Sequence, residues 1–378
     1  MSAARITLNK QALERLDVAT GPAGPFAFHS SFPEYRSTDL VALPAAAAEL
    51  GLAQVWVKDE SRRLGLGSFK ILGASWGVAR SFSAPAMPTT LDALVATARR
   101  SSPTFVAATE GNHGEAVAFM ARRLGLRARI HVPSTMEAWR REAISAQSAE
   151  LVTVEGTYDD ALRSAVADDV NTLLVSDAAW PGFEEIPRWI AEGYATMFAE
   201  IDQQLAAHGE AEPDLMLVQM GVGSLAEAAV RHYRTRPAGE RAARVVGVEP
   251  EDAACVFASI ERGELTTVPG PFVSTMAGLN CGSPSSAAWP SLRGGLSATI
   301  AMADDRVRWG RAQLAAVGID AGPAGAAGLA GLAEAALDPA LRAALGLTQE
   351  TRALVLATEG GPAHRQTRRP PPLVEVAR

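Results

Sequence analysis

The sequence predicts an α/β fold built from two doubly wound domains, each with a parallel sheet. Segments rich in Val, Leu and Ile alternate along the chain with Ala-rich helical stretches, which is typical of parallel strands wrapped by helices. The chain has 378 residues, and at about 150 residues per domain this length indicates two domains. Hydrophobic residues make up 48% of the chain and charged residues 20%, so we expect a well-buried core rather than disorder.

Eight short apolar segments bounded by turn residues are predicted as strands. In chain order they cover residues 54–58, 104–108, 128–132, 150–154, 172–176, 215–219, 245–248 and 354–357. Helices fill the intervals, and Gly125 is expected to end one of them in a left-handed conformation. The Ala- and Gly-rich stretch 322–331 is predicted as a loop that enters a helix over residues 332–337. We place a smaller domain at residues 75–190, inserted into a large domain made of residues 1–74 and 191–378.

Charge and hydropathy argue against several classes of partner. The formal net charge of −7 offers no electrostatic reason to bind nucleic acid. No uncharged run reaches the roughly 18 residues of a membrane span, and the N-terminus lacks a basic segment followed by an apolar one. We therefore expect a soluble, cytoplasmic protein with no membrane partner and no metal ion. The two cysteines, Cys255 and Cys281, form no disulfide framework and are expected to be small buried hydrophobes.

Three glycine-containing segments carry the strongest functional signal. They are Gly67-Ser68-Phe69-Lys70, Gly111-Asn112-His113-Gly114 and Gly221-Val222-Gly223-Ser224-Leu225. An aldehyde cofactor with a phosphate tail requires a lysine, a polar loop after a strand and a glycine-rich anion loop. The order and separation of the three segments make this interpretation much stronger than any one of them alone.

Lys70 is the predicted nucleophile, because its amine can form a Schiff base with the aldehyde. Ser68 can cap the helix that follows, which places Lys70 in the first turn of that helix. Backbone N–H groups there disfavour a positive charge and so favour the neutral amine. Gly65, Gly67 and Gly73 let another group approach the backbone closely, which distinguishes this lysine from an ordinary surface lysine at a helix start.

The polar loop after the strand 104–108 is the second candidate site. Asn112 could donate to a ring oxygen of the cofactor, while free N–H groups at the helix start hold an anion such as a substrate carboxylate. The alternative is a structural turn rich in Gly and Asn. His113 is expected to be a hydrogen-bonded scaffold residue rather than a catalytic one.

The third segment follows the strand 215–219 and leads into a helix. Its amides can wrap a phosphate at the positive helix end, and the Ser224 hydroxyl adds a donor. With Ala226 it also satisfies a dinucleotide fingerprint, and Glu249 ends the next strand where a ribose-binding acid would sit. A nicotinamide oxidoreductase is therefore the second hypothesis, although it leaves Lys70 and Asn112 unexplained.

The chain resembles the fold-type II pyridoxal-phosphate enzymes, the tryptophan synthase β superfamily, and most closely their diaminopropionate ammonia-lyase branch. The segments that carry the resemblance span residues 28 to 361 or so: Val57-Lys58-Asp59-Glu60-Ser61-Arg62-Arg63-Leu64-Gly65-Leu66, Ala108-Thr109-Glu110-Gly111-Asn112-His113-Gly114, Ser176-Asp177-Ala178-Ala179-Trp180, Met276-Ala277-Gly278-Leu279-Asn280-Cys281-Gly282 and Ala357-Thr358-Glu359-Gly360. The resemblance implies a homodimer that uses pyridoxal 5'-phosphate, bound by the large domain. It also implies cleavage of 2,3-diaminopropionate to pyruvate and two ammonias.

The resemblance also assigns roles to individual residues. Lys70 would be the Schiff-base lysine, Asn112 the partner of the ring oxygen and Thr358 the partner of the pyridine nitrogen. Gly221, Val222, Gly223, Ser224 and Leu225 would bind the phosphate. Asp177 and Glu110 would be active-site acids on the face opposite Lys70. A neutral partner such as Thr358 leaves the ring unprotonated, which favours elimination. Cys255 and Cys281 match positions that are paired in some of these lyases, so we expect them to lie close together with at most a labile bond.

Several departures from the family pattern leave the substrate open. Glu110 replaces the family aspartate, and its extra methylene displaces the carboxylate by roughly 1.5 Å. Gly361-Pro362-Ala363 replaces an acidic run, residues 321–325 lack a glutamate, and Thr38-Asp39-Leu40 replaces Thr-Pro-Leu. A threonine or serine dehydratase-like elimination, a β-replacement and a silent homologue therefore stay open as alternatives.

Overall fold

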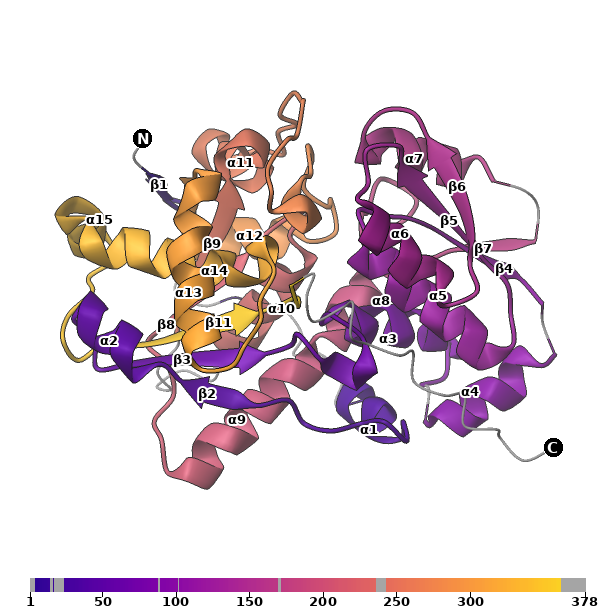
Figure 1. Ribbon diagram of the computed structural model, residues 1–378, viewed down its shortest axis with the longest axis horizontal. Coiled ribbons are helices and arrows are strands. Elements are labelled where there is room, and N and C mark those ends of the chain that lie inside the picture. Colours follow the sequence, from indigo (N-terminus) through magenta and orange to yellow (C-terminus); the bar gives the residue numbers. More distant parts are fainter. Residues whose placement is uncertain are drawn as a thin grey trace. The chain divides into compact units, whose positions relative to one another are not determined.

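The computed structural model describes residues 4–13, 16, 24–87, 89–100, 102–168, 171–235 and 243–361, which form two α/β units (Figure 1). The large unit consists of residues 4–13, 16, 38–61, 197–235 and 243–361. The small unit consists of residues 24–37, 62–87, 89–100, 102–168 and 171–196. In this part of the chain, no helix is long and apolar enough to span a membrane.

The large unit contains a seven-stranded sheet in the order β1-β10-β9-β8-β11-β3-β2. Its strands are β1 (Arg5–Leu8), β2 (Leu40–Ala42), β3 (Gln54–Asp59), β8 (Leu215–Gln219), β9 (Arg244–Pro250), β10 (Leu296–Met302) and β11 (Arg352–Ala357). The five inner strands are parallel, whereas the edge strands β1 and β2 run antiparallel to their neighbours. Strand β8 is central and pairs with both β9 and β11, so residues that follow β8 and β11 lie at the same edge of the sheet.

The large unit also contains helices, several of which pack against this sheet. They are α2 (Pro44–Leu50), α9 (Ala195–His208), α10 (Ser224–Arg234), α11 (Cys255–Arg262), α12 (Trp289–Gly295), α13 (Val307–Ala316), α14 (Pro323–Leu337) and α15 (Pro339–Ala344), with the 3-10 turns η2 (Glu251–Ala253), η3 (Ala277–Leu279) and η4 (Asp304–Arg306). Helices α2, α13 and α14 share one hydrophobic core with strands β3, β8, β9, β10 and β11. Figure 1 shows α13 and α14 in orange beside these strands.

Helix α14 differs from the prediction, because residues 323–337 form one continuous helix rather than a loop followed by a helix. Its glycines allow close packing on the sheet. A Cβ atom on Gly328 would lie 3.0 Å from the Gln219 side chain and 3.2 Å from the Leu217 carbonyl oxygen. A Cβ atom on Gly331 would lie 2.6 Å from Val248. Tertiary packing therefore outweighs the low helix propensity of glycine here.

The small unit contains a four-stranded parallel sheet in the order β6-β5-β4-β7. Its strands are β4 (Thr104–Ala108), β5 (Ala128–Pro133), β6 (Glu150–Val154) and β7 (Thr172–Leu174). Its helices are α1 (Gly24–Ser30), α3 (Lys70–Ser83), α4 (Leu91–Ala98), α5 (Asn112–Leu124), α6 (Ala138–Ser145), α7 (Tyr158–Val166) and α8 (Glu185–Gly193), with the 3-10 turn η1 (Arg63–Gly65). Helix α5 ends at Gly125, which has the expected left-handed conformation with φ of 69°.

The limits of the small unit differ from the predicted residues 75–190, because segments 24–37, 62–74 and 191–196 belong to it as well. Buried polar contacts explain the difference. His29, at the end of α1, contacts the Ser75 hydroxyl (3.0 Å) and the Leu72 carbonyl (3.0 Å) on α3, and the Thr196 hydroxyl (2.7 Å). These contacts join the first turns of α3 to α1 and to Thr196 at the start of α9. Lys70, the first residue of α3, therefore belongs to the small unit.

Candidate active site

Lys70 is the first residue of α3, so the prediction that it lies in the first turn of a helix is confirmed. The cap differs from the prediction, however. Phe69 occupies the N-cap position, and no side chain caps the helix. Ser68 is buried one residue earlier. The Lys70 side chain is only 19% exposed, so the helix start holds a mostly buried amine.

Asp177 forms an ion pair with Lys70, with a distance of 2.5 Å between Nζ and Oδ2. Asp177 follows strand β7 and is itself buried. Burial by itself would raise the pKa of Asp177, but the Lys70 ammonium and the nearby His113 hold the pKa well below its usual range. The carboxylate stabilises the charged form of the Lys70 amine, which is opposite to the effect that we expected from the helix start.

Glu110 lies two residues after strand β4, the parallel neighbour of β7. Because Val106 on β4 pairs with Leu174 on β7, the loops that carry Glu110 and Asp177 leave the same edge of the sheet. Glu110 is half-buried. Burial raises its pKa to about 7, although the Arg140 guanidinium acts in the opposite direction. A carboxyl group that titrates near neutral pH can either accept or donate a proton.

The Gly111–Gly114 turn opens helix α5, and Asn112 is the first residue of that helix. Gly111 has φ of 139°, a conformation that favours glycine. The Thr109 hydroxyl oxygen accepts hydrogen bonds from the N–H groups of Gly111 (2.8 Å) and Gly114 (3.0 Å). These two amides therefore already have an acceptor in the preceding threonine, and the binding of a substrate carboxylate by this helix start stays a prediction.

His113 is buried, and its Nε2 lies 2.8 Å from the carbonyl oxygen of Val175. A carbonyl oxygen only accepts hydrogen bonds, so Nε2 carries the hydrogen. Burial lowers the pKa of His113; Asp177 raises it and Lys70 lowers it further. A neutral, hydrogen-bonded ring is compatible with the scaffold role that we predict for this histidine.

Sequence reasoning missed two residues of this region, Tyr194 and Arg140. Tyr194 is fully buried near Lys70 and Asp177; burial raises the pKa of its phenol, and the Lys70 ammonium lowers it. Arg140 is the third residue of α6 and lies against Gly111. Neither residue belongs to a local motif, so no sequence signal marks it.

In the large unit, residues 221–225 connect strand β8 to helix α10. Gly223 is the N-cap residue of α10, with φ of 97° and no side-chain cap. A Cβ atom on Gly221 would lie 3.0 Å from the Cys281 sulfur and 3.2 Å from the Gly278 carbonyl oxygen. The close packing therefore requires glycine at position 221, and the uncapped helix start is suited to an anion.

Thr358 follows strand β11, the neighbour of β8, and is buried. Its hydroxyl oxygen accepts a hydrogen bond of 2.8 Å from the Gln219 side-chain amide. Because that oxygen already accepts a hydrogen bond, the hydroxyl hydrogen can be donated to a group that only accepts, such as an unprotonated ring nitrogen. Sequence reasoning did not identify Gln219 as a partner of Thr358. The only sequence signal for Gln219 was its position at the end of the strand that precedes the glycine-rich segment.

Comparisons with known proteins agree with this geometry. A family model described as "Pyridoxal-phosphate dependent enzyme" matches residues 32–358. The chain belongs to the pyridoxal-phosphate-dependent enzyme family. It is 37% identical over 291 residues to the diaminopropionate ammonia-lyase of Salmonella typhimurium, covering 74% of this chain and 71% of that protein.

Solved structures of the Escherichia coli diaminopropionate ammonia-lyase are also similar to this member of the family. The complex with D-serine matches with a TM-score of 0.88 and 30% identity over 96% of both chains. The complex with an aminoacrylate-PLP azomethine reaction intermediate matches with a TM-score of 0.85 and 30% identity, again over 96% of both chains. The predicted fold class, the pyridoxal 5'-phosphate cofactor and the resemblance to the diaminopropionate ammonia-lyases are confirmed.

The residues of this pyridoxal-phosphate enzyme fit the cofactor chemically. The small unit supplies a buried lysine beside a carboxylate, and the large unit supplies an uncapped helix start and a buried threonine hydroxyl. These groups match an aldehyde, a phosphate and a ring nitrogen respectively. The individual contacts of Lys70, Asn112, Thr358 and residues 221–225 with the cofactor stay predictions.

Neither Cys255 nor Cys281 is part of a disulfide, and both lie near Gly221; Cys255 is buried as expected, whereas Cys281 is only half-buried. The Cys255 sulfur lies 3.8 Å from the Gly221 carbonyl oxygen, and Cys281 is the residue that a Cβ atom on Gly221 would meet. Burial raises the pKa of the Cys255 thiol. The close approach expected of the two cysteines is compatible with these contacts.

Glu249 argues against the nicotinamide hypothesis. Its side chain is fully buried, and its carboxylate accepts hydrogen bonds from the N–H groups of Val256 (2.8 Å) and Phe257 (2.7 Å) at the start of α11. The carboxylate thus caps a helix instead of facing a ribose. Burial raises the pKa of Glu249 to about 8, while the two N–H groups lower it.

We expect Glu249→Ala to lower the free energy of unfolding by about 2 to 4 kcal/mol, since two buried N–H groups lose their acceptor. The wild-type carboxyl has a folded pKa of about 8, above its ordinary value of 4.5. The native state therefore binds more protons, and this group's contribution to stability falls as pH rises from about 4.5 to about 8. Chemical denaturation across this range measures both effects. Glu251→Ala, at an exposed residue nearby, is the control, and equal stability of the two variants would contradict the capping role.

Proposed function

We propose that this protein catalyses the pyridoxal-phosphate-dependent α,β-elimination of ammonia from 2,3-diaminopropionate. With one water, the products are pyruvate and two ammonias. The similarity to the Salmonella typhimurium and Escherichia coli diaminopropionate ammonia-lyases supports the substrate class. The observation that carries the proposal is the buried Asp177 carboxylate, whose Oδ2 lies 2.5 Å from the Lys70 amine. A buried carboxylate at the reactive amine suits a substrate with a second ammonium group.

In this proposal, Lys70 holds the aldehyde, Asn112 the ring oxygen, Thr358 the ring nitrogen and residues 221–225 the phosphate. Bound pyridoxal phosphate draws electrons away from the α-carbon of an amino acid. Thr358 would donate a hydrogen bond from its hydroxyl to the ring nitrogen, while its oxygen accepts from Gln219. An alcohol is too weak an acid to transfer the proton itself. A hydroxyl partner leaves the ring uncharged, which favours elimination over deeper carbanion chemistry.

The chain's own titratable groups handle the protons. The Lys70 amine takes the α-proton in its neutral form, on one side of the α-carbon. Asp177 binds the β-ammonium as a fixed carboxylate. Glu110, with a pKa of about 7, exchanges a proton at neutral pH and is the second candidate for the acid or base.

A second candidate function is a dehydratase-like elimination from serine or a β-replacement. The observation that favours it is Glu110 in place of the family aspartate, since misplacing a catalytic group by about 1 Å can cost about a hundredfold in rate. The D-serine complex of the Escherichia coli enzyme makes serine the matched comparison substrate. A homodimer in the cytoplasm is part of the proposal and rests on the family resemblance.

The test is kcat/KM for keto-acid formation on D- and L-diaminopropionate and on D- and L-serine, with wild type and Glu110→Asp. We expect the highest wild-type values on a diaminopropionate enantiomer, with an acid limb near pH 7 from Glu110. A slow wild type that Glu110→Asp accelerates on diaminopropionate would mean that Glu110 is suited to another β-substituted amino acid. If none of the four substrates yields keto acid, the lyase proposal fails and a β-replacement or a silent homologue moves ahead.

A further inference from the structure

Arg140, on helix α6, places a buried positive charge at the loop that carries Glu110. The Arg140 side chain is 3% exposed. A Cβ atom on Gly111 would lie 3.1 Å from both Cδ and Nη1 of Arg140, so the guanidinium packs directly on the residue after Glu110. Its Nε donates to the Glu137 carboxylate (3.1 Å), and its guanidinium carbon lies 4.3 Å from the centroid of the Trp139 ring. These contacts hold the guanidinium in one place.

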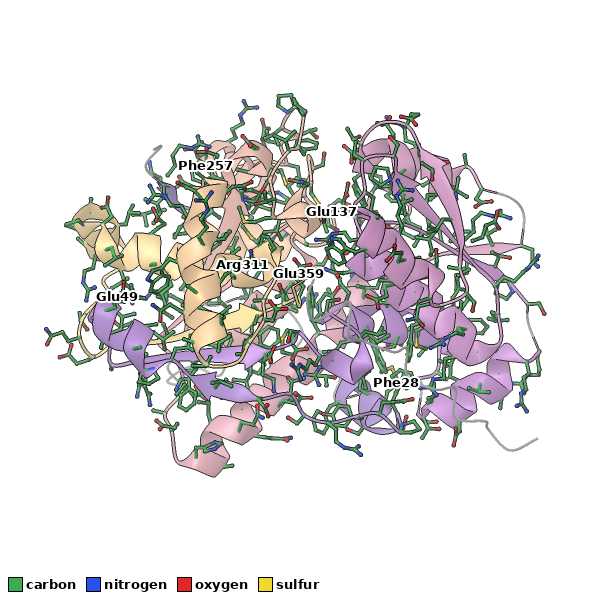
Figure 2. All side chains as sticks on the ribbon, in the orientation of Figure 1. Phe28, Glu49, Glu137, Phe257, Arg311 and Glu359 are labelled. Atoms are coloured by element: carbon green, nitrogen blue, oxygen red, sulfur yellow. The ribbon has the colours of Figure 1, made fainter. Side chains whose placement is uncertain are left out.

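One partner of the buried Arg140 charge, Glu137, is a surface residue. Glu137 precedes α6 (Figure 2), and its side chain is 58% exposed. An exposed carboxylate contributes little to an ion pair, whereas burying a guanidinium is costly. The Arg140 charge also acts on Glu110, whose pKa it lowers. The buried position of Arg140 against Gly111 therefore brings the charge to the loop that carries Glu110.

The neighbouring charged groups act mainly on one another. Lys70 on α3, His113 on α5 and Asp177 after β7 form one coupled set. Glu110 responds to burial, which raises its pKa to about 7, and to Arg140, which lowers it. Arg140 thus shifts Glu110 toward its carboxylate form in the pH range where the group titrates.

The charge state of Glu110 matters because a β-ammonium and a β-hydroxyl leaving group require opposite protonation states of a neighbouring carboxyl group. A β-ammonium leaves as neutral ammonia when the carbon–nitrogen bond breaks with its electron pair on nitrogen, so no added proton is needed. A β-hydroxyl leaves as water only when an acid supplies a proton. A carboxylate attracts the first group, and a carboxylic acid serves the second.

We propose that Arg140 is a specificity-determining positioning residue that shifts Glu110 toward its carboxylate form and so favours β-ammonium over β-hydroxyl amino acids. This inference rests on the proposed function, because both substrates undergo the same elimination. Arg140 acts through Glu110 and through the Gly111 backbone, not by contact with the substrate. Discrimination by a charge that favours one substrate and disfavours the other is a general route to specificity.

The variants Arg140→Gln and Arg140→Lys test the proposal. The first readout is the titration midpoint of the Glu110 carboxyl group, measured by carbon NMR on the protein without substrate. The Glu110→Gln variant identifies the Glu110 carboxyl signal. The midpoint should rise by about one pH unit in Arg140→Gln and return toward the wild-type value in Arg140→Lys. The second readout is the ratio of kcat/KM on diaminopropionate to kcat/KM on serine, which should fall about tenfold in Arg140→Gln.

Arg141→Gln is the matched control. Arg141 lies on the same helix, but its guanidinium binds the carbonyl oxygens of Pro133, Ser134 and Met136, away from Glu110. Both readouts should keep their wild-type values in this variant. Melting temperatures identify any variant that fails to fold. If Arg140→Gln does not fold, Arg140→Lys, which keeps the charge, tests the proposal through its Glu110 midpoint and its substrate ratio.

An unchanged Glu110 midpoint in Arg140→Gln would overturn the proposal, as would a shifted midpoint with an unchanged substrate ratio. Failure of the proposed function gives a different result. If the wild-type protein forms no keto acid from any substrate, both the proposed lyase activity and the specificity role of Arg140 are rejected. The NMR titration still reports whether Arg140 controls the charge of Glu110 in that case.

Discussion

Lys70→Ala is expected to abolish keto-acid formation, by about a thousandfold or more, together with the near-visible absorbance of lysine-bound cofactor. The same change removes the partner of a buried carboxylate. Because Asp177 is buried and its ion pair with Lys70 measures 2.5 Å, the variant without cofactor should also lose about 3 kcal/mol of stability at pH 7. Absorbance spectra, a keto-acid assay and urea denaturation measure the three effects.

Lys58→Met is the matched control for Lys70→Ala. Lys58 is fully buried in the large unit and pairs with Glu200 at 2.8 Å. Its replacement should reduce stability but leave the near-visible absorbance in place. A Lys70→Ala protein that kept both its absorbance and its turnover would refute the assignment of the reactive lysine.

Asp177→Asn is expected to lower kcat/KM on diaminopropionate by about a hundredfold, since a charged hydrogen bond to the β-ammonium contributes roughly 3 kcal/mol. Activity on serine should fall less, because the hydroxyl carries no charge. Lys70 holds the pKa of Asp177 below its ordinary value of 3.8. Its stabilising contribution is therefore present above about pH 4 and is lost as pH falls further. The variant should lose this acid-range dependence of stability.

Asp168→Asn provides the comparison for Asp177→Asn. Asp168 is a buried carboxylate of the same unit that pairs with Arg129 (2.5 Å) and His131 (3.0 Å). Its replacement should destabilise the protein while the substrate ratio stays at the wild-type value. If Asp177→Asn behaves in the same way, Asp177 is a structural residue and the β-ammonium binds elsewhere.

The strands show how far local pattern predicts this fold. All eight predicted strands are present, and β4, β6 and β8 have the predicted bounds. Among the described residues, β1, β2 and β10 are additional strands. Strands β1 and β2 are short antiparallel edge strands of three or four residues. Strand β10, with the sequence Leu-Ser-Ala-Thr-Ile-Ala-Met, has small and polar residues that weaken an apolar pattern.

Local sequence patterns were enough to predict the cofactor and the segments proposed to bind it. Each depends on local chemistry, namely a lysine at a helix start and glycines where a strand turns into a helix, as at Gly111 and Gly223 with φ of 139° and 97°. These requirements are met within a few residues, so they are visible in the linear chain. The comparisons confirm the family that they indicate.

The contacts between distant side chains became known only from the folded chain. Asp177, after β7, contacts Lys70 at the start of α3 although 107 residues separate them in the sequence. Arg140 lies against Gly111, Gln219 donates to Thr358, and Glu249 caps α11 instead of facing a ligand. Such pairings depend on strand order and on the packing of helices against each sheet, and no local periodicity encodes them. For the same reason, the charge states of Glu110 and Asp177 follow from burial and from distant partners rather than from the motifs that contain them.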